Sequence, residues 1–430
     1  MPAGWVEADL GEIADTALGK MLSAKAKLGV SPRPYLRNKN VQWGRIDVGD
    51  LLEMDFDEVE WEFFRLRAGD LLVCEGGEVG RAAIWRGDGD VGFQKALHRI
   101  RPLGGVLPSY LLYALERMAR ANGFERYVTG STIKHLPQED LRSLPMPLPP
   151  LAEQRRIVAA IEEQFSRLDA VGRDLTSAHA RLGRMPALIL QEAFRQFEEH
   201  VPLREVADVR LGRQRSPKNH LGPNMTPYLR AANVTWSGLD LSDVKSMNFT
   251  PNEVTTYRLE PGDVLLSEAS GSAGEVGKAA IWRQELDVCC FQNTLIRVRS
   301  QGPLPEFLRL FFLHAAITGQ FAQAAPGVGI HHLGAGRLAA WPVPVATESE
   351  QAEAVASLEQ RLSLIDSLRT AVELAQKRSD ALRRAILERA FRGELVPQDP
   401  DDEPASVLLE RIRAERAAAP KPTRRKRVPA

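Results

Sequence analysis

The residues that most resemble a catalytic motif are 271–278, Gly-Ser-Ala-Gly-Glu-Val-Gly-Lys, which follow an expected strand. A glycine-rich loop after a strand can bind nucleotide phosphates through its backbone N–H groups and a lysine. That motif requires glycine five positions before the Gly-Lys pair and serine or threonine directly after it. Ser272 and Ala279 occupy those positions. We therefore reject nucleotide hydrolysis and interpret the stretch as a loop.

Histidines and cysteines do not form a metal-binding pattern. His331 and His332 are adjacent, but no carboxylate or cysteine lies at ligand spacing from them. Three cysteines, Cys74, Cys289 and Cys290, are too few for a disulfide framework or a zinc site, and we interpret them as small core residues. Adenine-methyltransferase motifs and a glycine-rich cofactor turn are also missing from the sequence. We predict that this chain has no catalytic site, metal or cofactor of its own.

Three segments instead carry side chains that proteins use to contact DNA. Arginine and lysine suit guanine, asparagine and glutamine suit adenine, and short polar or basic groups bind phosphate. The segments are 25–40 with 213–233, 75–81 with 270–278, and 130–135 with 327–332. The candidate DNA-binding residues are Lys25, Lys27, Arg33, Lys39, Asn40, Ser131, Thr132, Lys134, Arg213, Arg215, Lys218, Asn219, Asn233, Ser270, Ser272 and His331. A basic loop residue is often only a solvated surface group, but each segment recurs at the matching place of a second copy.

The elements that must position these segments form a tandem repeat. Residues 34–43 (PYLRNKNVQW) recur as 227–236 (PYLRAANVTW), at an offset of 193 residues. After four extra residues in the second copy, residues 78–85 recur as 275–282 at an offset of 197. Self-similarity over such a period indicates two copies of one structural unit. Identical positions are expected to hold the fold, whereas differing positions such as Lys39 are better candidates for specificity.

Each copy changes character after about 145 residues of mixed strand and helix patterns. Apolar residues then recur at spacings of three and four, which predicts a long helix packed on another helix. The seam residues Ile161, Phe165, Leu168, Leu358, Leu362 and Ile365 are also our candidates for binding a partner protein. Pro186 is expected to kink or divide the first helix.

These patterns predict an α+β protein with two globular domains in tandem, each followed by a long helix. The two helices are expected to form an antiparallel coiled coil, which would give the chain pseudo-twofold symmetry. The predicted divisions are a first globular domain at 1–150, a first long-helix region at 151–199, a second globular domain at 200–346, a second long-helix region at 347–396, and a C-terminal tail at 397–430 with a short helix at 406–417 and a basic, disordered end.

Two stretches carry a resemblance to a known family. Residues 147–158 (PLPPLAEQRRIV) resemble the entry to the first spacer helix of the specificity subunits of type I restriction–modification enzymes. Residues 382–400 (LRRAILERAFRGELVPQDP), with their continuation to 412, resemble the C-terminal signature of the same family. The order of domains agrees over nearly the whole chain. One departure is the second junction, 342–348 (PVPVATE), which lacks the double proline.

The resemblance implies a DNA-binding subunit without catalysis of its own, which recognises a bipartite, asymmetric target in double-stranded DNA. It implies two modification subunits that bind S-adenosylmethionine and methylate adenine, and two restriction subunits that use ATP and Mg for translocation and cleavage. Half-sites on one face of DNA recur every ~34 Å, and a helix of about 30 residues spans ~45 Å. Such a helix could therefore act as a ruler between two half-sites.

Composition leaves this interpretation open. Lys plus Arg (56) balances Asp plus Glu (56), so only local basic patches can indicate DNA. The first residues lack the basic start and apolar core of a secretion signal, and no apolar run is long enough for a membrane span, so we expect a cytoplasmic protein.

The alternative is a stand-alone DNA-bridging regulator or scaffold without modification partners. An orphan methylation complex without a restriction subunit would share every feature above.

Overall fold

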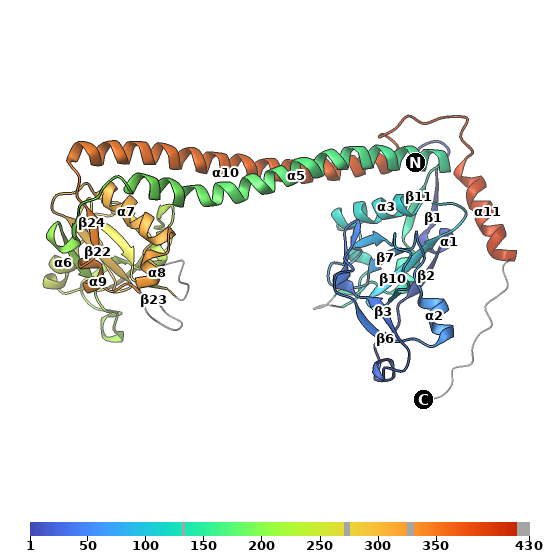
Figure 1. Ribbon diagram of the computed structural model, residues 1–430, viewed down its shortest axis with the longest axis horizontal. Helices are drawn as coiled ribbons and strands as arrows, with labels where there is room; N and C mark the ends of the chain where they lie inside the picture. The colour runs from blue at the N-terminus through green and yellow to red at the C-terminus, as the bar shows by residue number, and fades with distance from the viewer. Residues whose placement is uncertain (131–133, 271–275, 325–330, 419–430) are drawn as a thin grey trace. The chain divides into compact units, whose positions relative to one another are not determined.

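The first copy of the repeat folds around a four-stranded antiparallel sheet with strand order β2–β10–β7–β8. The computed structural model describes residues 1–130, 134–270, 276–324 and 331–418. Helix α3 begins with Pro108 as its first residue, and its apolar side packs into the core between the sheet and the helix α5 (Figure 1). The elements of this copy are β1 (Val6–Asp9), α1 (Leu10–Ile13), β2 (Ala14–Leu18), η1 (Lys25–Lys27), β3 (Pro32–Leu36), η2 (Asn38–Asn40), β4 (Val41–Gln42), β5 (Arg45–Ile46), β6 (Leu52–Asp55), α2 (Glu58–Phe64), β7 (Leu71–Cys74), β8 (Ala82–Ile84), β9 (Gly92–Phe93), β10 (Leu97–Pro102), α3 (Pro108–Arg120), η3 (Glu125–Tyr127), α4 (Gln138–Arg142), β11 (Pro145–Leu148) and α5 (Leu151–Phe194).

A second, smaller sheet in this copy has strand order β6–β3–β9, and the shared residues Pro34, Tyr35 and Leu36 end strand β3. Strand β3 pairs antiparallel with β6 and parallel with β9. Tyr35, Met54 and Phe56 are buried beneath it in a separate cluster. The identical residues of the repeat therefore lie where the smaller sheet packs on the domain.

The second copy repeats this topology with strand orders β13–β22–β18–β20 and β17–β14–β21. Its parallel pair β14–β21 matches β3–β9 of the first copy. The elements are β12 (His200–Pro202), η4 (Leu203–Glu205), β13 (Ala207–Leu211), η5 (Pro217–Asn219), β14 (Met225–Leu229), η6 (Ala231–Asn233), β15 (Val234–Thr235), β16 (Gly238–Leu239), β17 (Lys245–Asn248), α6 (Pro251–Tyr257), β18 (Val264–Ser267), β19 (Ala269–Ser270), β20 (Ala279–Ile281), β21 (Cys290–Phe291), β22 (Leu295–Ser300), α7 (Pro305–Ile317), α8 (Gln320–Ala324), β23 (His331–His332), α9 (Ala335–Ala339), β24 (Pro342–Pro344) and α10 (Glu348–Phe391).

The chain forms two compact units, 1–174 with 375–430, and 175–374. Each unit contains one α+β domain together with adjoining parts of α5 and α10. The long helices are therefore built into both units and do not make a domain of their own.

Inside each unit the two long helices pack against each other. In the first unit Arg383 of α10 forms an ion pair with Asp169 of α5 and lies over the Phe165 ring, 4.2 Å from its centroid. In the second unit Arg361 pairs with Glu192 at 3.1 Å, and Arg369 donates to the Leu182 carbonyl at 3.1 Å. Positions rise along α5 as they fall along α10, so the helices run antiparallel. The predicted α+β fold with two domains and an antiparallel coiled coil is confirmed.

Two expectations about the helices need correction. Helix α5 continues through Pro186 to Phe194, so the proline does not divide it. Both long helices contain 44 residues, more than the 30 or so that the ruler estimate assumed. Tertiary packing on both sides of Pro186, by Leu182 and Ile189, holds the helix together where local propensity would end it.

The Glu-Gln sequence at each junction ties the long helix to its domain. The side-chain oxygen of Gln154 accepts a hydrogen bond from the Leu107 N–H, and its amide donates to the Pro149 carbonyl. Gln351 makes the matching bonds with Leu304 and Ala346. Without the double proline, α10 still begins 197 residues after α5, because the buried glutamine sets the junction in both copies.

The C-terminal segment packs on the first unit. The helix expected over 406–417 is α11 (Ala405–Ala418), whose buried side includes Leu408, Leu409 and Ile412. Arg413 forms an ion pair with Glu12 at 2.9 Å, so charges reinforce the apolar contact. The basic end of the tail lies outside the described residues. Among the described helices, none is long and apolar enough to cross a membrane.

Candidate DNA interface

The first unit brings the three predicted segments together around Gly76. The Asn38 side-chain amide donates to the Gly76 carbonyl at 2.8 Å, and Arg81 donates to the Asn38 side-chain oxygen at 2.8 Å. Gly76 also forms a β-bridge with His135. Residues far apart in sequence, from three loops, therefore meet on one side of the domain, as a composite DNA-binding surface requires.

The second unit repeats this arrangement in its described parts. Strands β19 and β23 pair at the place that matches the bridge in the first unit. The Leu333 N–H donates to the Glu268 carbonyl at 2.8 Å, as Leu136 does to Glu75. The imidazole of His332 lies 3.1 Å from the Glu268 carboxylate.

A fourth segment belongs to the same surface, and the sequence analysis did not include it among the candidates. The turn 94–96 lies between the loops, because the Lys95 N–H donates to the Lys20 carbonyl at 2.8 Å and the Glu75 N–H donates to the Ala96 carbonyl at 2.9 Å. Lys95 is exposed. The recurrence of Phe93-Gln94 as Phe291-Gln292 was the signal that could have identified this turn.

Two of the candidate residues organise turns. Asn40 is 2% exposed, accepts a hydrogen bond from the Arg37 N–H and donates to the carbonyls of Asp47 and Asp50. Asn233 does the same in the second unit with Arg230, Asp240 and Asp243. A buried amide already satisfied in this way is not free to face a base. These two positions are therefore better explained by the fold than by base recognition.

Arg213 is also a structural residue. It is buried, forms an ion pair with Glu253 at 2.8 Å and lies over the Phe249 ring, 4.6 Å from its centroid. Lys20 occupies the matching place in the first unit, with Glu60 and the Phe56 ring as its partners. The charge of Arg213 is used in its ion pair with Glu253 and its contact with the Phe249 ring, and the same arrangement occurs in both copies.

The remaining described candidates keep their side chains at the surface. Lys39 forms an ion pair with Asp50, and Lys39 and Arg37 hold the pKa of the Asp50 carboxyl below its ordinary value. Arg33 is half-buried and lies over the Trp61 ring, 5.2 Å from its centroid. The exposed candidates are Lys25, Lys27, Lys39, Lys134, Arg215 and Lys218, and Asn219 is half-buried. Ser131, Thr132 and Ser272 lie outside the described residues, as do the side chains of Ser270 and His331.

The glycine of the Gly-Lys pair has a packing role. Gly277 has a φ of +82°, and a Cβ atom there would lie 2.3 Å from the Phe321 ring. Gly80 is in the same situation against Phe124. The last glycine of the motif that resembled a phosphate-binding loop thus allows a close backbone approach to an aromatic core residue.

Gly277→Ala is expected to destabilise the second unit by about 2–4 kcal/mol, because it combines left-handed strain with overpacking. Gly302→Ala is the control, since a Cβ there meets nothing within 4 Å. Thermal unfolding of the two variants checks this, and equal midpoints would contradict it.

Asp55 anchors the loop before β3. Its carboxylate accepts hydrogen bonds from the N–H groups of Gly29 and Ser31, each at 2.7 Å. Burial would raise the pKa of Asp55, but the backbone donors outweigh it and the pKa lies below its ordinary value. The second unit has Asn248 at this place, whose side-chain oxygen accepts from the Asn224 N–H at 2.8 Å.

The Asp55 anchor is expected to weaken in acid. A lowered carboxyl pKa stabilises the fold above the unfolded-state pKa of about 3.9, and this contribution is lost as pH falls through the folded-state value. Amide hydrogen exchange at Gly29 and Ser31, corrected for intrinsic rates, should therefore accelerate below about pH 4. Exchange at Asn224 is the internal control, because Asn248 does not titrate. Equal pH profiles for the two loops would contradict the assignment.

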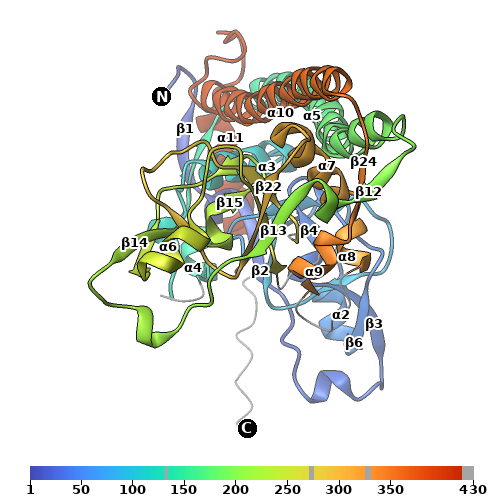
Figure 2. The same cartoon turned by 90° about the vertical axis from the view of Figure 1, so that its left-hand side faces the viewer.

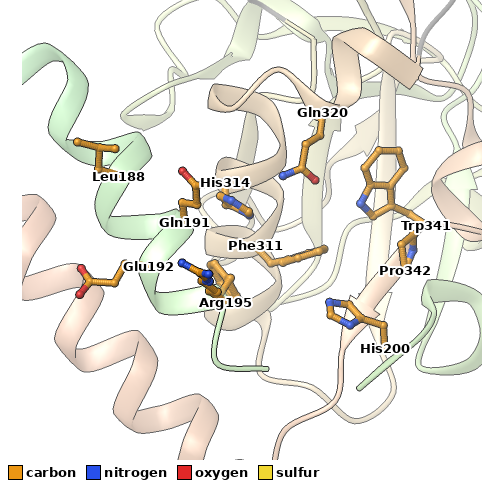
Figure 3. A pocket seen from close by; sticks show the side chains of 11 residues that line it. Leu188, Gln191, Glu192, Arg195, His200, Phe311, His314, Gln320, Trp341 and Pro342 are labelled. Atoms are coloured by element: carbon orange, nitrogen blue, oxygen red, sulfur yellow. The ribbon is translucent and has the colours of Figure 1, made fainter. Parts of the chain in front are cut away.

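A cavity of about 660 Å³ in the second unit lies between the end of α5 and α7 (Figure 3). Phe311 and Trp341 form part of its wall, and Arg195 lies at its edge. His314 stacks on the Phe194 ring at 5.6 Å, and burial lowers the pKa of its imidazole. The described residues that line this cavity come from other segments than the candidate DNA-binding residues, so we do not assign it to DNA.

The cysteines and the predicted partner-binding residues are core residues. Burial raises the pKa of the Cys74 thiol to about 11 and those of Cys289 and Cys290 to about 12, so the thiols stay protonated near neutral pH. The six seam residues pack inside the units: Ile161, Phe165, Leu358 and Ile365 are buried, and Leu168 and Leu362 are partly buried. Their apolar surface is used within the chain, and a partner would have to bind other residues of the helices.

The comparisons with known proteins agree with this architecture. Residues 2–173 match the model of the type I restriction modification DNA specificity domain. The EcoKI specificity subunit of Escherichia coli strain K12 is 24% identical over 459 aligned positions, which cover 97% of each chain. Over residues 2–173 the chain is similar to the type I restriction–modification specificity domain, and over nearly its whole length it is similar to type I specificity subunits.

Further specificity subunits align with this chain over similar lengths. The StySPI specificity subunit of Salmonella potsdam is 23% identical over 97% of each chain. The HsdS subunit of Thermoanaerobacter tengcongensis shares the fold, with a TM-score of 0.58, 20% identity and coverage of 92% of this chain and 98% of that one. A chain from a study of complex assembly and conformational transition in the type I R-M system has a TM-score of 0.75 at 21% identity, covering 92% and 99%.

Proposed function

We propose that this chain recognises a bipartite, asymmetric DNA target and directs adenine methylation and restriction by partner subunits. Each α+β domain would recognise one half-site, in a complex that acts on DNA in the cytoplasm. The chain itself would supply no catalytic group. The two domains differ at exposed positions, such as Lys39 against Ala232, so the two half-sites should differ in sequence.

One observation carries the proposal: the same loops converge in both units. The Gly76 neighbourhood of the first unit and the β19–β23 neighbourhood of the second unit arise from sequence segments at matched offsets. Their exposed lysines and arginines suit phosphate and guanine. A protein that reads two separated half-sites needs two such surfaces on one chain.

The partners supply the chemistry in this proposal. Two modification subunits would bind S-adenosylmethionine, and two restriction subunits would use ATP and Mg. We propose that the antiparallel helices set the number of unspecified base pairs between the half-sites. Because the seam residues are buried, docking of modification subunits falls to the exposed side of α5 and α10, whose large exposed apolar residues are Val171, Met185, Leu188, Leu364, Leu368, Leu374 and Leu382.

The decisive experiment coexpresses this chain with its cognate modification subunit and maps methylated adenines across a host genome by single-molecule sequencing. We expect a bipartite motif with one methylated adenine on each strand. Omission of this chain is the control and should abolish methylation. If no complex with a modification subunit forms, the proposed function is wrong and the alternative of a stand-alone DNA-bridging regulator or scaffold is favoured.

A further inference from the structure

An exposed leucine recurs at the same place in a loop of both domains. Leu28, in the loop between β2 and β3, is 69% exposed, and Leu221, in the loop between β13 and β14, is 82% exposed. The two positions are separated by the repeat offset of 193 residues. Single exposed leucines are common on protein surfaces and need no explanation. An exposed leucine at matched positions of two diverged copies does need one.

The loop that carries each leucine is held from below. In the first unit Asp55 binds the N–H groups of Gly29 and Ser31, which flank the leucine on its C-terminal side. Lys20 in turn donates to the Asp55 carbonyl at 2.6 Å. The tip is therefore positioned by side chains that point inward, while Leu28 points away from the core.

The second unit holds its loop with equivalent residues. Asn248 accepts from the Asn224 N–H, and Arg213 donates to the Asn248 carbonyl. The Phe249 N–H donates to the Asn224 carbonyl at 3.0 Å, as Phe56 does to Ser31 in the first unit. A carboxylate in one unit and an amide in the other thus hold the loop that exposes a leucine at the same position.

Basic residues precede both leucines. Lys25 and Lys27 precede Leu28 on the short helix η1, and both are exposed. Lys218 and His220 precede Leu221 and are also exposed. Figure 2 shows each loop extending away from the sheets of its own unit. An apolar side chain next to basic side chains suits DNA, whose phosphates are charged and lie outside and whose stacked bases are apolar and lie inside.

We propose that Leu28 and Leu221 are apolar wedges, each of which enters a groove of the DNA and partly unstacks one base step in or beside its half-site. Architectural DNA-binding proteins insert leucine, proline and other apolar side chains between base steps in this way. The residue two positions further on is exposed Val30 in the first loop and exposed Pro223 in the second. The neighbouring lysines hold the adjacent phosphates. This inference rests on the proposed function and adds a mode of binding to it.

The test uses the complex of the full chain with its modification subunit and a duplex that contains the motif found by methylation mapping. 2-Aminopurine, which brightens when it is unstacked, replaces one base at a time across both half-sites. The wild-type complex should brighten the probe at one step per half-site. Leu28→Ala should remove the signal at one half-site and Leu221→Ala at the other, and each should weaken binding about tenfold.

Two comparisons make the result specific. Val407→Ala removes an exposed apolar side chain on α11 and should change neither fluorescence nor affinity. The slope of log affinity against log salt should be unchanged in the leucine variants, because no charge is removed.

The outcomes separate the wedge from the proposed function. If the leucine variants keep the fluorescence and the affinity while methylation of the motif persists, the wedge is wrong and the proposed function stands. If they lose the modification subunit from the complex, the leucines contact protein and the wedge is also wrong. If the wild-type complex methylates no bipartite motif, the proposed function fails, and the wedge fails with it.

Discussion

Asp263→Ala is expected to lower the free energy of unfolding of the second unit by about 3–5 kcal/mol. The Asp263 carboxylate is almost completely buried and accepts both Nε and Nη2 of Arg299 at 2.7 and 2.8 Å. It also accepts the Glu260 N–H at 2.7 Å, which closes the turn before β18. Removal of the buried carboxylate takes away the bidentate partner of the half-buried Arg299 guanidinium and opens the turn. The Gly-Asp sequence recurs in the first unit, where Asp70 makes the same contacts with Arg101 and Arg67.

Hydrogen exchange measured by mass spectrometry on peptides from β18 and β22 checks this effect within the second unit. Glu260→Ala is the matched control, because Glu260 also pairs with Arg299, at 2.7 Å, but is exposed. Exposed ion pairs contribute about 0–1 kcal/mol. If the two variants lose the same protection from hydrogen exchange in β18 and β22, the buried Asp263 does not stabilise the second unit more than the exposed Glu260 does.

Removal of the two repeat-matched lysines, in the double variant Lys25→Ala and Lys218→Ala, is expected to weaken DNA binding about ten- to thirtyfold near physiological salt. Each lysine that contacts a phosphate contributes about 0.9 to the slope of log affinity against log salt, so the slope should fall by about 1.8. Preference for the target over other DNA should change little, because phosphate contacts carry no sequence information.

Fluorescence anisotropy of labelled duplex at several salt concentrations measures both quantities on the complex with the modification subunit. The control is the double variant Arg86→Ala and Arg283→Ala, which removes the same charge from repeat-matched exposed positions outside the candidate segments and outside α5 and α10. If the control variant loses the same affinity, the effect comes from net charge, and the loop lysines make no specific contacts with DNA.

The sequence by itself determined the repeat, the order of elements and the resemblance to type I specificity subunits. These follow from local patterns: the offsets of 193 and 197 residues, the helical spacing after each Glu-Gln pair, and the strands after each Gly-Asp pair. Such patterns depend on neighbouring residues and on periodicity, which the chain shows without folding. The seam residues of the helices were recognised for the same reason.

Tertiary structure alone decided which polar residues face outward. Asn40, Asn233 and Arg213 have the composition of DNA-contacting residues, but contacts from distant segments bury them and use their hydrogen-bonding groups. The turn at Lys95 joined the candidate surface through backbone bonds to Lys20 and Glu75, which no spacing encodes. Burial and long-range hydrogen bonds depend on what packs against a residue. A pattern of residue types therefore identified the segments, but only the fold decided which of their side chains are buried and which are exposed.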